Sequence, residues 1–559
     1  MTKPAMPNID LNPHDWTEVK RILERYVPQY DVWVFGSRAT WKAKAYSDLD
    51  LTVVTDTKFS LATLAHLQSA FDESDLSIKV DVVDWAATGE AFREIILKTA
   101  VVVQKAQKIQ DATKPSDMKM TNYGAFAVDY AVERLASLCA PGNGVQTGPF
   151  GSQLHQEDYV SVGTPIITVE HLGNNRILHQ DLPRVSDKDR DRLSKYQLRE
   201  GDIVFSRVGS VDRRSLVRKE EDGWLFSGRC LRVRPDNQKI DSTYLSYFFG
   251  LPAFKEHIRS IAVGATMPSL NTQLLSGIFV PHPKDLEAQR TISHILGTLD
   301  DKIELNRRMN ETLENMARAL FKSWFVDFEP VRAKSEGRDT GLPEEIADLF
   351  PDSFEDSEFG EVPKGWLLSS FADTVEIIGG GTPKTSVAEY WDGDIPWFSV
   401  VDAPNETDVF VIDTQKKITR TGLEGSSTRL LPEGSTIISA RGTVGKVALV
   451  GVPMAMNQSC YGLRSLDDSH FFAYFSIRTL IDTLKQRSHG SVFDTITRDT
   501  LTGITTVVPS GLIKRTFELK VAPMMQRIRS NLLESSILKA QRDTLLPKLL
   551  SGEIRVKEH

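Results

Sequence analysis

The chain has 559 residues, of which 40% are hydrophobic and 25% charged, so we expect several folded domains rather than a single core. No apolar run is long enough to span a membrane and the first residues lack a signal-peptide core, which predicts a cytoplasmic protein without membrane attachment. The net charge of −8 excludes a chain that is basic throughout, although a local basic surface could still bind nucleic acid.

The first hundred residues alternate predicted helices and strands, which is typical of an α/β unit. The expected helices are Trp16–Tyr26, a short one after the first strand, Leu61–Phe71 and Gly89–Leu97. The expected strands are Asp31–Phe35, Asp48–Thr55 and Lys79–Asp84. A polar stretch that contains Pro115 follows, and its composition predicts a linker.

The rest of the chain consists of two similar halves. In each half, a turn-rich stretch with short strands precedes a long helix. The predicted strand Gly201–Arg207 in the first half corresponds to Gly434–Arg441 in the second, and Val280-Pro281 corresponds to Val508-Pro509. Agreement at several separate places indicates an internal duplication.

Both long helices carry a stripe of residues that alternates steps of four and three. The first stripe comprises Ile292, Leu296, Leu299, Ile303, Asn306, Asn310, Leu313, Ala317, Leu320 and Trp324. The second comprises Phe517, Val521, Met524, Ile528, Asn531, Ser535, Leu538, Arg542, Leu545 and Leu549. Two matched stripes predict an antiparallel coiled coil with pseudo-two-fold symmetry.

Three details of this coiled coil can be predicted. The equivalent core residues Asn306 and Asn531 would fix the register of the helices at a cost in stability. The stretch from Ile292 to Trp324 would be roughly 50 Å long at the helical rise. Pro523 would begin the main part of the second helix or kink it.

These features predict an α+β multidomain protein. The expected parts are an α/β unit at 1–106, a linker at 107–122, a first globular part at 123–285, a first long helix at 286–334, a second linker at 335–363, a second globular part at 364–510 and a second long helix at 511–559.

Residues 123–559 resemble the specificity subunit of a type I DNA restriction-modification enzyme. The resemblance rests on the order of the parts and on the strings Thr147–Leu154, Gly379–Lys384, Gly393–Trp397, Glu287–Arg290 and Leu546–Ile554. It implies that each globular part is a target recognition domain that reads half of a bipartite, asymmetric site on double-stranded DNA. It also implies two partner methylation subunits, which carry S-adenosylmethionine and methylate adenine, and restriction subunits with helicase-nuclease activity. The specificity part itself would need no cofactor.

Arginine and lysine are the side chains that most often contact guanine, so basic residues near turns are candidates for DNA contact. They are Arg207, Arg213, Arg214 and Arg229 in the first globular part, and Lys384, Arg429, Arg441 and Lys446 in the second. Arg207 and Arg441 are expected to take equivalent places after the corresponding strands. Each of these residues could equally be an ordinary solvated surface side chain.

The α/β unit contains a separate motif. Gly36-Ser37-Arg38 follows the first strand, and Asp48 and Asp50 lie two residues apart on the next one, where both carboxylates would share a face. Asp81 on the third strand could complete a cluster that binds Mg²⁺ together with substrate phosphates. The nearby acids Asp56 and Asp84 are expected to be surface residues.

With this motif, residues 15–105 resemble the minimal nucleotidyltransferase family. The resemblance implies a nucleoside triphosphate, with ATP as the first choice, and Mg²⁺ held by the catalytic residues Asp48, Asp50 and Asp81. Gly36, Ser37 and Arg38 would contact the triphosphate. Small members of the family often act as antitoxins that adenylylate a partner toxin, which implies a protein substrate and a regulatory or antitoxin-like role.

Three interpretations stay open at this point. The chain is a DNA-specificity subunit with an appended nucleotidyltransferase domain, active or inactive. Alternatively, it is a nucleotidyltransferase that its C-terminal part targets to DNA or to a partner. In the third interpretation it is a scaffold whose long helices only dimerise the protein.

Overall fold

The computed structural model describes residues 7–556 except 28–29, 45–46, 56–66, 69, 72–73, 75, 106–116, 143, 150–152, 265, 359, 405–407 and 488–494. The chain divides into two compact units, one formed by residues 1–297 with 543–559 and the other by residues 298–542. None of the helices in these described segments combines the length and the apolar content that a membrane span requires.

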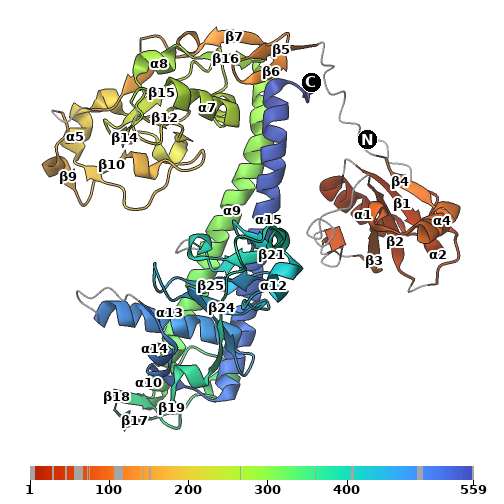
Figure 1. Cartoon of the computed structure of the whole chain (residues 1–559), viewed down its shortest axis with the longest axis vertical. Coiled ribbons are helices and arrows are strands. Elements are labelled where there is room, and N and C mark those ends of the chain that lie inside the picture. The colour runs from red at the N-terminus through yellow and green to blue at the C-terminus, as the bar shows by residue number, and fades with distance from the viewer. Residues whose placement is uncertain are drawn as a thin grey trace. The chain divides into compact units, whose positions relative to one another are not determined.

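The N-terminal domain is a small α/β sheet with strand order β3-β2-β1-β4 (Figure 1). Its elements are α1 (Pro13–Tyr26), β1 (Asp31–Phe35), α2 (Gly36–Ala39), β2 (Leu49–Val54), β3 (Val80–Asp84), α4 (Glu90–Thr99) and β4 (Val101–Gln104). β2 runs parallel to β3, whereas β1 is antiparallel to both β2 and β4. The three predicted strands are therefore present, and the fourth, β4, was not predicted. Most of the predicted helix Leu61–Phe71 lies outside the described residues.

A β-hairpin occupies the end of the segment that we predicted as a linker. β5 (Met118–Thr121) pairs antiparallel with β6 (Gly124–Ala127), and the chain reverses at Asn122 and Tyr123. Thr121 Oγ1 supports the turn by accepting a hydrogen bond from the Tyr123 amide at 3.1 Å. The predicted linker 107–122 is thus too long at its C-terminal end, because a polar composition concealed a short two-stranded pairing.

The two globular parts, which we call the first head and the second head, contain the same main sheet. In the first head the order is β13-β12-β15-β8, and in the second it is β25-β24-β27-β20 with β22 added at the edge. The first set is β8 (Val145–Thr147), β12 (Ile203–Ser206), β13 (Arg214–Leu216) and β15 (Cys230–Val233). The second is β20 (Val375–Gly379), β22 (Phe410–Val411), β24 (Thr436–Ser439), β25 (Val447–Val450) and β27 (Cys460–Ser465). The predicted duplication is therefore a duplication of strand pairing.

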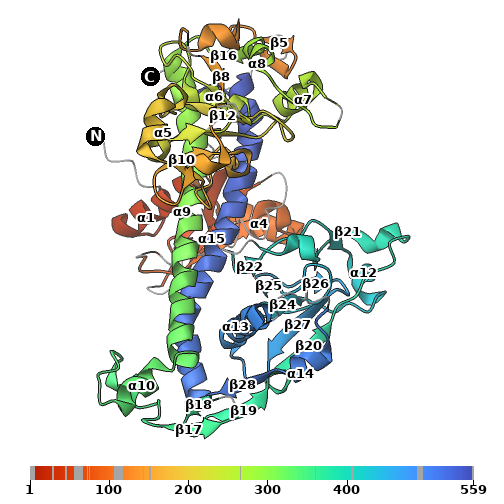
Figure 2. The same ribbon diagram turned by 90° about the vertical axis from the view of Figure 1, so that its left-hand side faces the viewer.

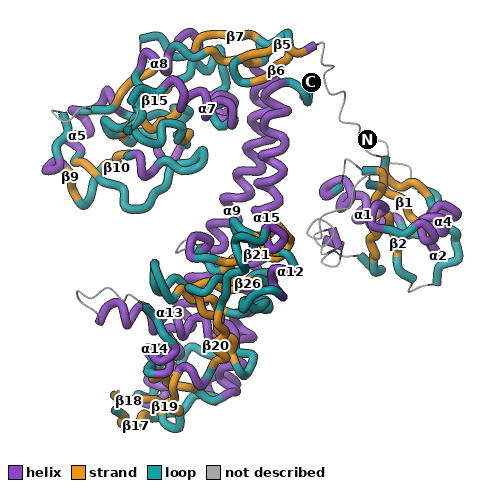
Figure 3. Tube along the Cα trace, in the orientation of Figure 1, coloured by secondary structure: helices purple, strands orange, loops and turns teal. Residues whose placement is uncertain are grey.

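Smaller pairings repeat as well. In the first head β10 (Thr164–Ile167) is antiparallel to β11 (Arg184–Val185) and parallel to β14 (Leu225–Phe226). In the second head β21 (Trp391–Phe398) is antiparallel to β23 (Lys417–Ile418) and parallel to β26 (Ala455–Met456). β16 (Phe279–His282) pairs with β7 (Ala131–Arg134), as β28 (Thr505–Val508) pairs with β19 (Leu367–Ser370). Figure 3 shows these short strands and the loops between them.

The heads differ in the helix that follows the main sheet. The first head has two short helices, α6 (Ser242–Phe248) and α7 (Pro252–Ile261), whereas the second has one longer helix, α13 (His470–Arg487). Pro252 accounts for the interruption, because proline begins a helix readily but cannot continue one. Figure 2 shows α13 beside the strands β24, β25 and β27.

The long helices α9 (Leu286–Phe325) and α15 (Gly511–Ser551) run side by side (Figures 1 and 2). Within residues 298–542 they are antiparallel, since Asp300 contacts Arg542 at 2.6 Å while the rings of Phe321 and Phe517 lie 5.7 Å apart. The residues of both predicted stripes are buried or half-buried. This confirms the predicted antiparallel pair.

One alternative of the prediction is excluded. α15 has 41 residues in all and continues through Pro523, so this proline does not begin the helix. α9 has 40 residues, about 60 Å at 1.5 Å per residue, and contains the stretch from Ile292 to Trp324 that was predicted to be roughly 50 Å long. The buried core positions are otherwise as predicted, with Asn306 and Asn531 almost fully inaccessible.

Candidate functional site

Three carboxylates lie near one end of the N-terminal sheet. Asp50 on β2 is in register with Asp81 on the parallel strand β3, so both side chains leave the same face. Asp48 lies two residues before Asp50 and is exposed, whereas Asp50 and Asp81 are half-buried. Parallel pairing of β2 and β3 therefore brings Asp50 and Asp81 together, with Asp48 just before β2 and near enough to affect Asp50.

The electrostatics of this cluster suit a cation. Burial raises the pKa of Asp50, and the neighbouring carboxylates of Asp81 and Asp48 raise it further, while Lys79 opposes the shift. Lys79 Nζ also lies 2.6 Å from Asp81 Oδ1 and balances part of the charge. No three acidic, histidine or cysteine side chains in the described part of the chain are close enough to form a ready-made metal site. The donor set thus fits a divalent cation chemically, but Asp81 would have to leave Lys79 to join it.

Gly36, the first residue of α2, lies beside the same site directly after β1. The register of β1 and β2 places Phe35 opposite Asp50. A Cβ atom on Gly36 would lie 2.5 Å from Asp50 Oδ2, and the backbone φ of Gly36 is +75°. Both facts require glycine, because any side chain would clash with the carboxylate and strain the backbone. Ser37 follows in the first turn of α2 and is half-buried.

Arg38 does not have the role that the sequence suggested. Its side chain is only 7% exposed. Nε and Nη2 donate to the carbonyl oxygen of Ser47 at 2.9 and 2.8 Å, and Nη1 donates to the carbonyl of Asp10 at 2.7 Å. Because a buried guanidinium needs such acceptors, this residue anchors the segment that leads into Asp48 rather than offering itself to a triphosphate.

The expectation for Asp84 is also wrong. Its carboxylate is buried, accepts a hydrogen bond from Thr55 Oγ1 at 2.5 Å and caps the next short helix through the amide of Ala86 at 3.0 Å. An acid at the end of a strand can cap the following turn instead of facing solvent, and the sequence does not distinguish the two. Asp56 lies outside the described residues.

In each head, the strand at the centre of the main sheet ends in a turn built around a serine. The amide of Ser206 donates to the carbonyl of Arg213 at 2.9 Å, and the amide of Ser439 donates to the carbonyl of Lys446 at 2.9 Å. The serine hydroxyls donate to carbonyls within the turn, Ser206 to that of Val208 and Ser439 to that of Thr443. Arg213 and Lys446 therefore occupy equivalent places.

This equivalence corrects the expected match between Arg207 and Arg441. The amide of Arg207 donates to the carbonyl of Arg229 at 2.8 Å, and the counterpart of that bond is donated by Ala440 to Ser459 at 2.7 Å. Arg207 thus corresponds to Ala440, and Arg441 is one residue further along. The sequence suggests a match of the two arginines because each follows a similar strand.

The candidate DNA-contacting residues differ in accessibility. Arg214 is 4% exposed and its Nε donates to the carbonyl of Ser246 at 3.0 Å, so it supports the head from within and cannot reach DNA. Arg207 is half-buried and donates to the carbonyl of Gly228. Those that are exposed are Arg213, Arg229, Lys384, Arg429 and Arg441, and Lys446 is half-buried.

Matching glycines lie beside these turns. A Cβ atom on Gly148 would lie 2.2 Å from the carbonyl oxygen of Ser227, and one on Gly380 would lie 1.9 Å from that of Asn457. Each glycine thus allows the same close approach of two backbone segments next to the main sheet. These glycines belong to the predicted strings Thr147–Leu154 and Gly379–Lys384, of which residues 150–152 lie outside the described part.

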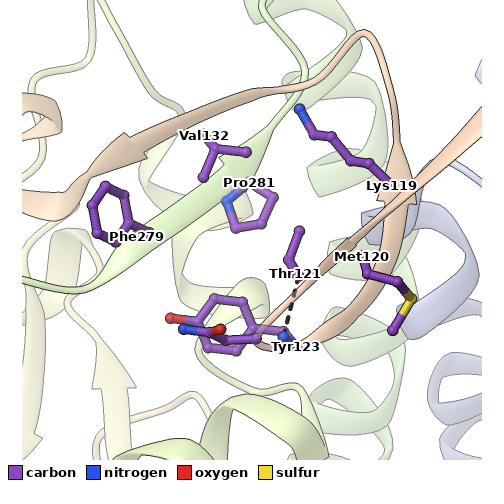
Figure 4. Close-up of a pocket in the computed structure, with 8 residues that line it drawn as sticks. Lys119, Met120, Thr121, Tyr123, Val132, Phe279 and Pro281 are labelled. Atoms are coloured by element: carbon purple, nitrogen blue, oxygen red, sulfur yellow. Dashed lines mark hydrogen bonds between the residues drawn. The ribbon is translucent and has the colours of Figure 1, made fainter.

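A cavity of about 280 Å³ lies at the base of the first head, between the β5–β6 hairpin and the β7–β16 pair (Figure 4). Tyr123, Val132, Phe279 and Pro281 supply much of its lining. The lining also includes Lys119, whose Nζ donates to the carbonyl of Tyr130 at 2.7 Å. With an apolar wall and an occupied amine, this cavity offers no catalytic groups.

Comparison with known families agrees with both parts of the chain. Residues 145–315 and 363–510 match the type I restriction modification DNA specificity domain. Residues 17–109 match the polymerase beta nucleotidyltransferase family. The first match covers most of the first head, the whole second head and the N-terminal three-quarters of α9. The second covers the sheet that carries Asp48, Asp50 and Asp81.

Individual relatives show the same division. The HindI type I restriction enzyme specificity subunit of Haemophilus influenzae is 30% identical over 429 residues, which are 68% of this chain and 92% of the relative. The MjaIX specificity subunit of Methanocaldococcus jannaschii is 24% identical, over 79% of this chain and 98% of the relative. The probable protein adenylyltransferase MntA of Haemophilus influenzae is 47% identical over 104 residues, which are 19% of this chain and 91% of the relative.

Proposed function

Since the chain belongs to the DNA-specificity subunits of type I restriction-modification enzymes and carries an N-terminal nucleotidyltransferase domain, we propose that its two heads read the two halves of a split DNA target. The observation that carries this proposal is the identical strand order of the two main sheets. Two similar frameworks with different loops can contact DNA in similar ways and still read different bases, which makes the target asymmetric.

The exposed basic residues of the heads support this proposal. Arg213 and Lys446 extend from equivalent turns, and Arg229, Lys384, Arg429 and Arg441 are exposed in the same heads. We assign these side chains to phosphate and base contacts, and we assign Arg207 a contact at the edge of the same surface. Two methylation subunits with S-adenosylmethionine and the helicase-nuclease subunits would supply the chemistry on the DNA.

Selection from a random DNA pool tests this function. The full-length chain purified with its methylation subunits should enrich sequences with two fixed tracts separated by unread base pairs. Replacing the second head, residues 364–510, by that of another family member should change one tract and leave the other unchanged. Enrichment of a single continuous tract, or a change in both tracts, would contradict the proposal.

For the N-terminal domain we propose nucleotidyl transfer to a protein. The acceptor hydroxyl would attack the α-phosphorus of ATP, form a phosphodiester bond and release pyrophosphate. Asp48 and Asp50 would hold Mg²⁺, which neutralises phosphate charge when it is bound, and Asp81 would accept the proton of the acceptor hydroxyl. Gly36 and Ser37 would contact the triphosphate, while Arg38 holds the segment before Asp48 in place.

The support for this second function is the convergence of Asp48, Asp50 and Asp81 beside Gly36, together with the similarity to a probable protein adenylyltransferase. Incubating the full-length chain and its partner subunits with α-labelled ATP and Mg²⁺ should label a protein. The Asp48→Ala/Asp50→Ala variant should abolish the label and leave DNA selection unchanged. Labelling without any DNA selectivity would instead favour a nucleotidyltransferase that its C-terminal part only targets. A regulatory or antitoxin-like role follows if the labelled protein is a toxin or a subunit of the complex.

A further inference from the structure

In each half, hydrogen bonds join the start of the head helix that follows the main sheet to the long helix of the same half. In the first half, the carboxylate of Asp241 caps α6 by accepting the amide of Tyr244 at 2.8 Å. Ser293 on α9 donates its hydroxyl to the same oxygen, Oδ1, at 2.6 Å, and Gln289 Oε1 accepts the amide of Asp241 at 2.8 Å. Gln289 is fully buried and Ser293 is 7% exposed, so this contact is part of the packed interior.

In the second half, the carboxylate comes from the long helix and not from the head. The amide of Phe472, in the first turn of α13, donates to Oε1 of Glu518 on α15 at 2.7 Å. Ser469, the residue before α13, is neutral and buried. Lys514 on α15 forms an ion pair with Asp467 of the head and is 9% exposed. A residue of the long helix α15 therefore caps the head helix here, whereas a residue of the head itself does so in the first half.

The residues on the two sides are equivalent. Ser293 and Glu518 directly follow Ile292 and Phe517, the first residues of the matched stripes. Asp241 and Ser469 each directly precede the head helix of their half. Acid and hydroxyl have thus exchanged sides, with the acid on the head in the first half and on the long helix in the second.

Each head also packs against the other long helix, as Arg478 of α13 does with Glu314 of α9, so the exchange concerns only the contact at the start of the head helix. We propose that it is a recognition code by which the start of each head helix docks at this position of its own long helix and rejects the equivalent position of the other. In the crossed arrangement, Asp241 of the first head would face Glu518 of α15, and two acids would share one buried contact. The second head would bring Ser469 against Ser293, and no carboxylate would cap α13. Since the halves share a fold, crossed docking between two copies of the chain is the competing structure that such a code excludes.

A double-mutant cycle on the full-length chain tests whether the exchange matters. Ser469→Asp places an acid opposite Glu518, and Ser293→Glu places one opposite Asp241. Each should lower the thermal midpoint of unfolding by roughly 4 °C or more. The double variants Ser469→Asp/Glu518→Ser and Asp241→Ser/Ser293→Glu each reproduce the pair of residues found in the other half. Each should recover at least half of the decrease in the thermal midpoint. Leu519→Asp adds the same charge on the exposed face of α15 and serves as the control, with little change expected.

A second measurement separates a recognition code from a merely local contact. In the Asp241→Ser/Ser293→Glu chain both halves have serine before the head helix and glutamate on the long helix, so the heads no longer distinguish the long helices. Refolded from denaturant at high concentration, it should give a several-fold larger dimer fraction in light scattering than the wild type treated in parallel. Additive effects in the cycle, or coupling without extra dimer, would overturn the proposal.

Discussion

Asn531 donates a side-chain hydrogen bond to Asn310 Oδ1 at 2.8 Å in the buried core of the long helix pair. Its equivalent in the first half, Asn306, donates to Ser535 Oγ at 3.2 Å and to Glu534 Oε2 at 2.8 Å. The repeat relates these two sets of bonds to each other. A slip of one helix along the other would break both sets together, so this layer of polar core residues specifies the register of the two long helices.

Replacing Asn310 and Asn531 together by leucine should therefore stabilise the pair and weaken its specificity. We expect the thermal midpoint to rise by roughly 2–4 °C, because buried amides cost stability relative to apolar side chains. Size-exclusion chromatography should show several oligomers instead of one species. The single variant Asn531→Leu removes the hydrogen bond that Asn310 Oδ1 accepts and should lower the thermal midpoint. A single species for the double variant would contradict the assignment of register to this layer.

The acidic cluster of the N-terminal domain predicts a conflict between stability and metal binding. Asp50 has a raised pKa because of burial and the carboxylates of Asp81 and Asp48, so its charged form is unfavourable in the folded domain. In EDTA, Asp50→Asn should raise the thermal midpoint of unfolding of the N-terminal domain. Mg²⁺ or Mn²⁺ should raise the midpoint of the wild type but not that of the variant. Asp84→Asn is the matched control, since it removes a buried acid that caps a helix and should lower the midpoint with or without metal. Equal stabilisation of wild type and Asp50→Asn by metal would contradict the proposed site.

Glu518 predicts a pH dependence for the second unit. Burial raises its pKa to about 7 from a usual 4.5, and the charge of Asp467 adds to the shift, while the amides of Phe472 and Phe471 oppose it. The folded state then binds more protons than the unfolded state between these values, so stability falls as pH rises from 4.5 to 7 and is constant above. The free energy of unfolding therefore falls by at most about 3 kcal/mol between pH 4.5 and 7 because of this group.

Glu518→Gln should remove this dependence. Urea unfolding followed between pH 5 and 8 should give a wild-type free energy that declines with pH and a nearly flat profile for the variant, with the larger difference at pH 8. Asp467 contributes in a lower range. Burial alone would raise its pKa, but hydrogen bonds from Lys514 and Ser465 outweigh burial and hold it at about 2. Its stabilising contribution is therefore lost only below about pH 4. A wild-type profile that rises between pH 5 and 7 would contradict the role of Glu518.

The equivalent turns of the heads predict which basic residues matter for DNA. Arg213→Ala and Lys446→Ala should each weaken DNA binding up to roughly 10-fold and reduce the slope of log affinity against log salt by about 1. Lys446→Ala should leave the midpoint of unfolding unchanged, whereas Arg213→Ala should lower it slightly because Nη2 of Arg213 donates to the carbonyl of Leu172 at 2.7 Å. Arg214→Ala should instead lower the midpoint, because it removes a buried hydrogen bond to Ser246. Unchanged DNA binding in both Arg213→Ala and Lys446→Ala would exclude these turns from the interface.

Much of this organisation could be predicted from sequence because it depends on periodicity. The stripes through Asn306 and Asn531 and the spacing of Asp48 and Asp50 follow directly from helix and strand geometry. The role of Arg38 could not, since it depends on the carbonyls of Ser47 and Asp10 that only the fold brings near. Nor could the match of Arg213 with Lys446, because backbone hydrogen bonds from Ser206 and Ser439 define it and the residues between differ in type.

If the two heads read two separate tracts of DNA, methylome sequencing of cells that express this chain with its methylation subunits should show it. We expect adenine methylation at one asymmetric motif of two fixed tracts separated by several unread base pairs, and loss of this methylation when either head is deleted. Methylation at a single uninterrupted motif, or methylation that persists without one head, would contradict it.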